Sequence, residues 1–200
     1  MYAPSFPQRL LLVALILFTA VATCVAVGAG PAHAACPANV AIGVGGNTDG
    51  NANVFGNMVE RRAVYSGMLN DFGGALGAID REVNAVRSSC PGTFILLAGH
   101  SQGGAAVHVW AAQHPRFGNI KIFAYADPKL EGRGASQGVF LLGGPPVAGT
   151  DSNFGANPYV TLCRGDDLVC NSPFGIPTPA HNMYNFNPRA WLGANGVVWV

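Results

Sequence analysis

Charged side chains are scarce in this sequence, and neither sign dominates. The 200 residues include 11 Lys and Arg and 10 Asp and Glu, which leaves a formal net charge of +1. Nucleic acids and anionic membrane surfaces attract proteins that carry a concentrated positive charge. The composition therefore argues against a nucleic-acid partner. Glycine, in contrast, is abundant at 27 residues, which is typical of a loop-rich globular protein.

The sequence also has no internal repeat, heptad pattern or low-complexity linker. Such segments are what usually separate domains, so nothing marks a boundary inside the chain. The length of residues 35–200 suits one domain with one hydrophobic core. We therefore expect a single domain over that range.

Residues 1–34 have the pattern of a secretory signal peptide. Arg9 is followed by an uncharged, mostly apolar run over residues 10–30, and small residues at 31–34 (Pro-Ala-His-Ala) resemble a cleavage site. We expect cleavage after residue 34 and export of the rest of the chain. The mature protein is then secreted and extracellular, with no integral membrane partner.

Two other interpretations of this segment remain open. The apolar run is long enough to span a bilayer, so an uncleaved anchor is one alternative. A lipid attached to Cys24 is the other, although Thr23 stands where lipoprotein signals usually have a smaller residue.

The cysteine count supports removal of the segment. Five cysteines are an awkward number for a secreted protein, and loss of Cys24 leaves Cys36, Cys90, Cys163 and Cys170. An even number in an exported chain predicts two disulfides, with three possible pairings. We favour Cys36 with Cys90 and Cys163 with Cys170, in part because the second pair closes a short loop. A four-cysteine zinc site is the alternative, but it lacks the usual C-x-x-C pairs.

Short apolar runs alternate with segments of helical periodicity. The runs predict strands at residues 40–44, 93–98, 120–126 and 159–163, and the other segments predict helices at 57–66, 75–89 and 102–114. Strands that alternate with helices imply a parallel sheet covered on both faces. We therefore expect an α/β fold, a three-layer sandwich around a mostly parallel sheet. Residues 131–158, rich in Gly and Pro, predict an irregular flap.

The most informative motif lies where a predicted strand becomes a helix. Residues 99–103, Gly-His-Ser-Gln-Gly, fit the G-x-S-x-G pattern of a nucleophile elbow. Glycines on both sides of Ser101 remove the clashes of a tight turn, and the helix N-terminus can stabilise a negative oxygen. The alternative is a glycine-rich turn around a phosphate. The sequence has no G-x-x-x-x-G-K, which argues against a nucleotide loop.

A serine hydroxyl needs a base, and His181 is the candidate. In nucleophile-elbow enzymes the chain order is Ser, then Asp or Glu, then His. His181 is the only histidine beyond the last acidic residue. His100 lies inside the elbow, and His108 and His114 lie on the following helix, so we expect structural roles for these three.

Several carboxylates could orient that base. The candidates are Asp127, Glu131, Asp151, Asp166 and Asp167. A bridge between Cys163 and Cys170 would fix a loop that carries two of them directly after a strand, which suits an orienting acid. Asp127, at the end of another strand, is the main rival, and its alternative role is a turn former.

Taken together, these motifs resemble the cutinase family of secreted serine esterases, which includes the acetylxylan esterases. The resemblance rests on G-H-S-Q-G at 99–103 shortly after Cys90, on a C-x-x-x-D-x-x-C pattern at 163–170, and on His181 eleven residues beyond. It covers most of residues 36–190, although 131–158 matches poorly. The resemblance implies an α/β-hydrolase fold.

The resemblance also implies roles for individual residues. Ser101 would be the nucleophile, His181 the base and then the acid, and Asp167 the orienting carboxylate, with Asp166 a solvent-facing neighbour. The family's disulfides would pair Cys36 with Cys90 and Cys163 with Cys170, in agreement with the pairing favoured above.

An oxyanion hole is implied as well. Its first donor would be the backbone N–H of Gln102. The second comes in this family from a Ser or Thr after the first strand, within an Arg-Gly-Ser sequence. Here that loop reads Gly-Gly-Asn-Thr-Asp at 45–49, so Asn47 or Thr48 would have to serve.

The function implied by the resemblance is hydrolysis of carboxylic esters through an acyl-serine, without a metal or cofactor. The substrate would be cutin, a lipid or a short-to-medium acyl ester, and we expect a monomer. Apolar residues at 139–142 and 174–177 form a rim for an acyl chain or simply cover the core. Two alternatives remain: a carbohydrate deacetylase of the acetylxylan esterase type, weakly suggested by Ala-Asp-Pro at 126–128, and a non-catalytic cell-wall-associated protein on the same scaffold.

Overall fold

A parallel sheet of six strands forms the centre of the computed structural model, which describes residues 35–138 and 149–200. The strand order is β2-β1-β3-β4-β5-β6, and every pairing between neighbours is parallel. The strands are β1 (Asn39–Val44), β2 (Arg61–Arg62), β3 (Phe94–His100), β4 (Ile120–Tyr125), β5 (Tyr159–Cys163) and β6 (Gly196–Trp199). Because all strands run the same way, the loops that follow them meet at one edge of the sheet.

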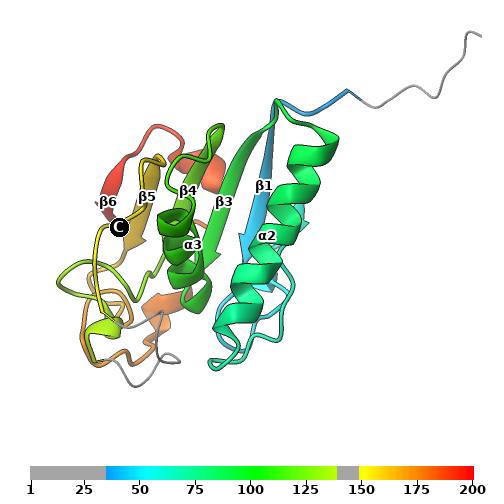
Figure 1. Cartoon of the computed structure of the whole chain (residues 1–200). Helices are drawn as coiled ribbons and strands as arrows, with labels where there is room; N and C mark the ends of the chain where they lie inside the picture. Colours follow the sequence, from blue (N-terminus) through cyan, green and yellow to red (C-terminus); the bar gives the residue numbers. More distant parts are fainter. Residues whose placement is uncertain (1–34, 139–148) are drawn as a thin grey trace, which may run out of the picture. The chain divides into compact units, whose positions relative to one another are not determined.

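Two α-helices cover one face of this sheet, α2 (Phe72–Ser89) and α3 (Gln102–Gln113), as Figure 1 shows. Helix α2 begins at Asp71, whose carboxylate accepts the N–H of Gly74 as an N-cap. Its buried face carries the spacing of three and four that the sequence predicts, with Ala75, Ala78, Ile79, Val83 and Val86. Helix α3 is short and buried for most of its length, because β3 and β4 both contact it.

The opposite face of the sheet is covered by shorter pieces. Its core includes Phe55 from the 3-10 helix η1 (Asn53–Phe55), and Trp191 from η4 (Pro188–Trp191) packs against that core. The predicted α/β sandwich with a parallel sheet is confirmed. Its second outer layer consists of 3-10 turns and irregular segments in place of α-helices.

Four predicted strands and two predicted helices agree with the structure to within a few residues, but the helix predicted at 57–66 is wrong. This segment contains β2, which pairs with Ile42 and Gly43 at the edge of the sheet. The Glu60 side chain accepts the N–H of Ala41, so contacts with β1 outweigh the local helical preference. The sequence pattern also does not predict β6, a strand of only four residues at the opposite edge.

Residues 131–158 are irregular wherever the structure describes them, apart from the 3-10 helix η2 (Ala135–Gly138). The predicted signal peptide at 1–34 and the apolar segment at 139–142 lie outside the described residues. Among the described residues, no helix combines the length and the apolar character needed to cross a bilayer.

Two disulfides close the loops that the cysteine pattern predicts. Cys36 pairs with Cys90 at a Cα–Cα distance of 5.5 Å, and Cys163 pairs with Cys170 at 5.8 Å. The sequence separations of 54 and 7 residues imply stabilisation of about 4 and about 2.5 kcal/mol through reduced entropy of the unfolded chain. The first disulfide ties the start of β1 to the end of α2, and the second fixes the loop after β5.

The turn from β3 to α3 is strained at Ser101, which has φ 58° and ψ −122°. Two glycines make this geometry possible. A Cβ atom on Gly99 would lie 2.0 Å from the carbonyl oxygen of Gly103, and one on Gly103 would lie 2.2 Å from that of Val44. The elbow is therefore packed backbone against backbone, and it places Ser101 at the edge where the loops meet.

We expect Gly103→Ala to lower the free energy of unfolding by about 3 kcal/mol, because its methyl group would meet backbone that cannot move aside. Gly77→Ala, inside α2, is the matched control. Its Cβ would lie 3.8 Å from the nearest atom, at the tip of Arg81, and the change should stabilise the helix by about 0.5–1 kcal/mol. Urea denaturation measures both. Wild-type stability of the Gly103 variant would contradict the close packing of the elbow.

Candidate active site

Ser101 opens into a pocket of about 310 Å³ at the carboxyl edge of the sheet. Three segments far apart in the sequence build its walls: the loop after β1, the elbow, and the region of η3 (Pro179–Asn182). The lining residues include Asn47, Thr48, His100, Ser101, Pro177 and His181. The structure thus brings the predicted nucleophile, the predicted base and both candidates for the second oxyanion donor to one pocket.

The predicted acid contacts the predicted base directly. Nδ1 of His181 lies 3.0 Å from each carboxylate oxygen of Asp167, and both side chains are buried. An ionised carboxylate has no proton to donate and only accepts hydrogen bonds. The proton of a neutral His181 ring therefore belongs on Nδ1. The other ring nitrogen, Nε2, is then left with a lone pair, as a general base requires.

Asp167 is held in its ionised form by several donors. Its Oδ1 accepts the N–H of Val169 at 3.0 Å, and its Oδ2 accepts the hydroxyl of Tyr184 at 2.6 Å. Burial by itself raises the pKa of Asp167, but the hydrogen bonds from His181 and Tyr184 outweigh it and lower the pKa below its ordinary value. The same contact and burial raise the pKa of Tyr184.

Ser101 and His181 both line this pocket. Among the described residues, no hydrogen bond joins the Ser101 hydroxyl to the His181 ring. Gly46 keeps the space beside the serine open, because a Cβ there would lie 2.8 Å from Cβ of Ser101 and 3.3 Å from its Oγ. Where a nucleophile and a general base share a site, the contact between them is often long without substrate and tightens only when substrate binds.

Two backbone N–H groups are available beside the serine. Gln102 is the first residue of α3, so its N–H has no partner within the helix. Asn47 makes no backbone N–H hydrogen bond to any residue that the structure describes. The N–H of Thr48, in contrast, donates to the Gly67 carbonyl at 2.7 Å, which leaves it unable to bind an oxyanion.

Two further residues of the site escaped the sequence analysis. Tyr184 follows His181 by three residues, and His100 lies in the elbow, where the sequence predicts only a structural role. Nε2 of His100 lies 2.8 Å from the carbonyl oxygen of His181, and its ring lines the pocket. The only signal in the sequence was proximity to the motif residues, which does not reveal such contacts.

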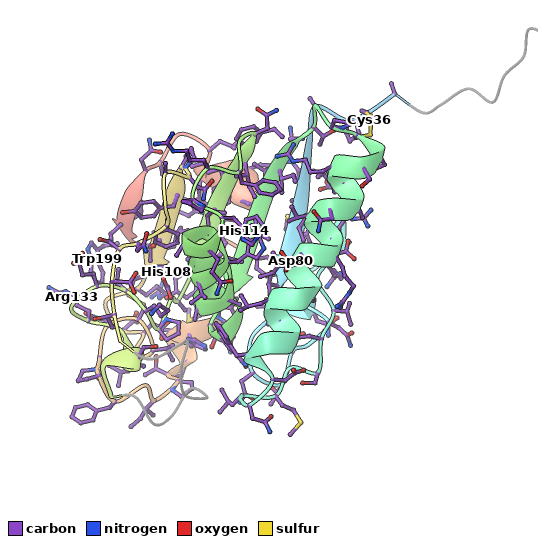
Figure 2. All side chains as sticks on the ribbon, in the orientation of Figure 1. Cys36, Asp80, His108, His114, Arg133 and Trp199 are labelled. Atoms are coloured by element: carbon purple, nitrogen blue, oxygen red, sulfur yellow. A yellow bond between two sulfur atoms is a disulfide. The ribbon has the colours of Figure 1, made fainter. Side chains whose placement is uncertain are left out.

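The rival acid, Asp127, is engaged elsewhere. Its Oδ2 lies 2.7 Å from Nδ1 of His108, whose Nε2 lies 2.9 Å from Asp151. Figure 2 labels His108 on α3, and its ring stacks on Phe154. Burial lowers the pKa of His108, but the two carboxylates outweigh it and raise the pKa above its ordinary value. Asp127 therefore belongs to a buried ion-pair network and not to the pocket of Ser101.

The remaining candidates also have other contacts. Asp166 is exposed and pairs with Arg164, as expected of a solvent-facing neighbour. His114 stacks on Trp110 and lies 3.7 Å from Asp80 of α2, a pair labelled in Figure 2. No group of His, Cys, Asp and Glu within the described ranges has an arrangement that could hold a metal ion.

Comparison with known proteins identifies the fold and the family. A cutinase-like protein from Cryptococcus sp. superposes with a TM-score of 0.58 at 20% identity, covering 83% of this chain and 99% of that chain. Trichoderma reesei cutinase, in complex with a phosphonate inhibitor, gives 0.52 at 18% identity, covering 79% and 76%. A search of curated proteins finds no match.

These likenesses, at low identity, show the fold. The family assignment rests on the sequence itself, because the model of the cutinase family matches residues 50–190. That range is more than half of the chain, and it includes the elbow, the loop between the paired Cys163 and Cys170, and His181. The chain belongs to the cutinase family, whose members are carboxylic-ester hydrolases.

Proposed function

We propose that this protein is a secreted serine esterase in which Ser101 is the nucleophile, His181 the base and Asp167 the orienting acid. The observation that carries the proposal is the contact between buried Asp167 and His181, because His181 lines the same pocket as a serine on a strained elbow. This arrangement has the three roles of a catalytic triad in the chain order of the α/β hydrolases.

In the proposed reaction, Nε2 of His181 takes the hydroxyl proton of Ser101 as the oxygen attacks the ester carbonyl. The ring becomes a cation, and ionised Asp167 stabilises it through Nδ1. The proton then passes to the leaving alcohol, which departs and leaves an acyl-serine. Water attacks this acyl group while His181 takes its proton, and the acid is released with Ser101 restored.

The oxyanion of each tetrahedral intermediate would bind the backbone N–H groups of Gln102 and Asn47. The Asn47 side chain can add an amide donor, because Asn47 lines the pocket. Thr48 is less suited because its N–H already donates to Gly67. Donors fixed in place before the reaction stabilise the developing charge without reorganisation.

Apolar side chains beside the pocket support esters with an acyl chain as substrates. Phe174 and Ile176 are more than half exposed, and the next residue, Pro177, lines the pocket. Met183, two residues after His181, is also more than half exposed. The Ala-Asp-Pro sequence that suggested a carbohydrate deacetylase lends that alternative little support, because Asp127 binds His108.

Two disulfides support the proposal that the protein acts outside the cell. Disulfides form and persist in oxidising compartments and are rare in the cytosol. They agree with export directed by residues 1–34, whether that segment is cleaved or kept as an anchor.

Ser101→Ala should abolish labelling by a fluorophosphonate probe and lower kcat for p-nitrophenyl butyrate by about 10³-fold or more, because no other group can form the acyl-enzyme. Ser152→Ala, at an exposed serine, is the control and should label and turn over like the wild type. Intact-protein mass spectrometry measures the labelling, and steady-state kinetics measure kcat.

The outcomes separate the remaining alternatives. If the probe does not label the wild-type protein and the protein hydrolyses no ester, the result would favour the non-catalytic alternative. Labelling with activity on acetylated xylan but not on butyrate or longer esters would favour the carbohydrate deacetylase. Undiminished labelling of the Ser101 variant would exclude Ser101 as the nucleophile.

For the oxyanion hole, we expect Asn47→Ala to lower kcat by about 10²-fold with a smaller change in KM, because it removes the side-chain amide donor, which acts mainly on the transition state, and keeps the backbone N–H. Thr48→Val is the matched variant and should lose much less. A larger loss in the Thr48 variant would assign the second donor to its hydroxyl group.

Tyr184→Phe should lower the free energy of unfolding by about 2 kcal/mol at pH 7, because it removes a donor from a buried charged carboxylate. The folded-state pKa of Asp167 is lowered, so this stabilisation is present above the unfolded pKa of about 4 and is lost as pH falls through the folded value. The two proteins should therefore converge in stability in acid. Urea denaturation from pH 7 to pH 3 tests this.

Tyr159→Phe serves as its control, because the hydroxyl of Tyr159 makes no hydrogen bond among the described residues. This variant should match the wild type across the range. A Tyr184 difference that stays constant with pH would show that its hydroxyl does not stabilise the ionised acid.

A further inference from the structure

His100 makes a contact that the proposed mechanism does not use. Its Nε2 lies 2.8 Å from the backbone carbonyl oxygen of His181, 81 residues further along the chain. A carbonyl oxygen only accepts, so Nε2 of His100 must carry the proton and donate it. The elbow that presents the serine is thus bonded directly to the short η3 helix that presents His181.

The two imidazole rings also touch. Their centroids are 4.6 Å apart with an angle of 41° between the planes, and Phe186 packs edge-on against His100 at 5.0 Å. His100 is buried at 5% exposure. His100 therefore restrains the backbone of His181 through the hydrogen bond and its side chain through the contact between the rings.

This neighbour stays uncharged. Burial lowers the pKa of His100 to about 4, and the adjacent His181 adds to the effect. The charged or titratable groups that act on or pack against His100 are His181, Asp167, Asp49 and Tyr184. A neutral ring can lie against His181 when that ring becomes a cation during the reaction, whereas a second cation would oppose it.

We propose that His100 is a positioning residue, which holds the His181 imidazole between Asp167 and Ser101 through the hydrogen bond to the His181 carbonyl and the contact between the rings. This role rests on the proposed function. Its physical basis is that η3 is a single turn that begins at Pro179, and one turn has too few internal hydrogen bonds to fix a ring precisely.

Three variants of His100 separate its parts. His100→Gln keeps an N–H donor near the position of Nε2 but loses the ring. His100→Asn places its amide at the depth of Nδ1, too short to reach the carbonyl. His100→Phe keeps a ring without a donor. His114→Gln, at a histidine stacked on Trp110 at the opposite end of α3, is the control for loss of an imidazole away from the pocket.

We expect the Asn and Phe variants to lower kcat for p-nitrophenyl butyrate by about 10- to 100-fold with KM changed by less than about threefold, because misplacement of a base acts on the chemical step. The kcat of the Gln variant should be about tenfold higher than the kcat of the Asn variant. His114→Gln should leave kcat unchanged.

A second readout does not depend on activity. The Nδ1–H proton of His181, bonded to Asp167, should give a downfield NMR signal in the wild type, the Gln variant and the His114 control. It should weaken or vanish by exchange with water in the Asn and Phe variants. If the wild type hydrolyses no ester and takes no probe, the proposed function fails, while this signal still tests the contact.

Circular dichroism and thermal unfolding verify that the Asn and Phe variants are folded. The proposal is overturned if these variants keep the wild-type kcat and the wild-type His181 signal. It is also overturned if the Gln variant loses as much as the Asn variant in both readouts. Should one variant fail to fold, the comparison of the Gln variant with the remaining one decides by the same criteria.

Discussion

The negative charge of Asp167 is the constraint on which the arrangement of the site depends. A buried carboxylate is costly unless donors surround it, and here the donors are Val169, Tyr184 and His181. Two of them come from the segment that follows the Cys163–Cys170 loop, so satisfying one charge folds that segment back over the end of the sheet. The hydrogen bond from His181 also fixes the tautomer of its ring. The same contact therefore stabilises the buried carboxylate and leaves Nε2 of His181 with a lone pair.

The parallel sheet supplies the other half of the site. Because every strand runs the same way, the loop after β1, the elbow after β3 and the loop after β5 all emerge at one edge. The glycines allow these backbones to approach closely, and Gly103 in particular lies against the carbonyl of Val44. The strain at Ser101 persists because the surrounding strands and α3 determine its position more strongly than the local preference of the residue.

Much of this could be predicted from the sequence, for identifiable reasons. The elbow, the cysteine spacing and the position of His181 are local patterns with a physical meaning, and the strands and helices around them follow hydrophobic periodicity. The segment at 57–66 could not be predicted, because pairing of Arg61 with Ile42 is a contact between distant residues. For the same reason the sequence does not reveal that His100 reaches the His181 carbonyl, nor that Asp127 faces His108.

Two buried histidines, His100 just before α3 and His108 inside it, show how neighbouring groups shift the pKa of an imidazole. Both ring nitrogens of His108 lie against carboxylates, Asp127 and Asp151, which outweigh burial and raise the pKa of the ring, and the second contact ties Asp151 to the helix. His100 faces a carbonyl and another imidazole, and burial keeps it neutral. A raised pKa at His100 would favour a second cation beside His181 in the proposed reaction, and a lowered pKa at His108 would favour an uncharged ring against the Asp127 carboxylate. The neighbours of each histidine therefore decide the direction in which its pKa is shifted.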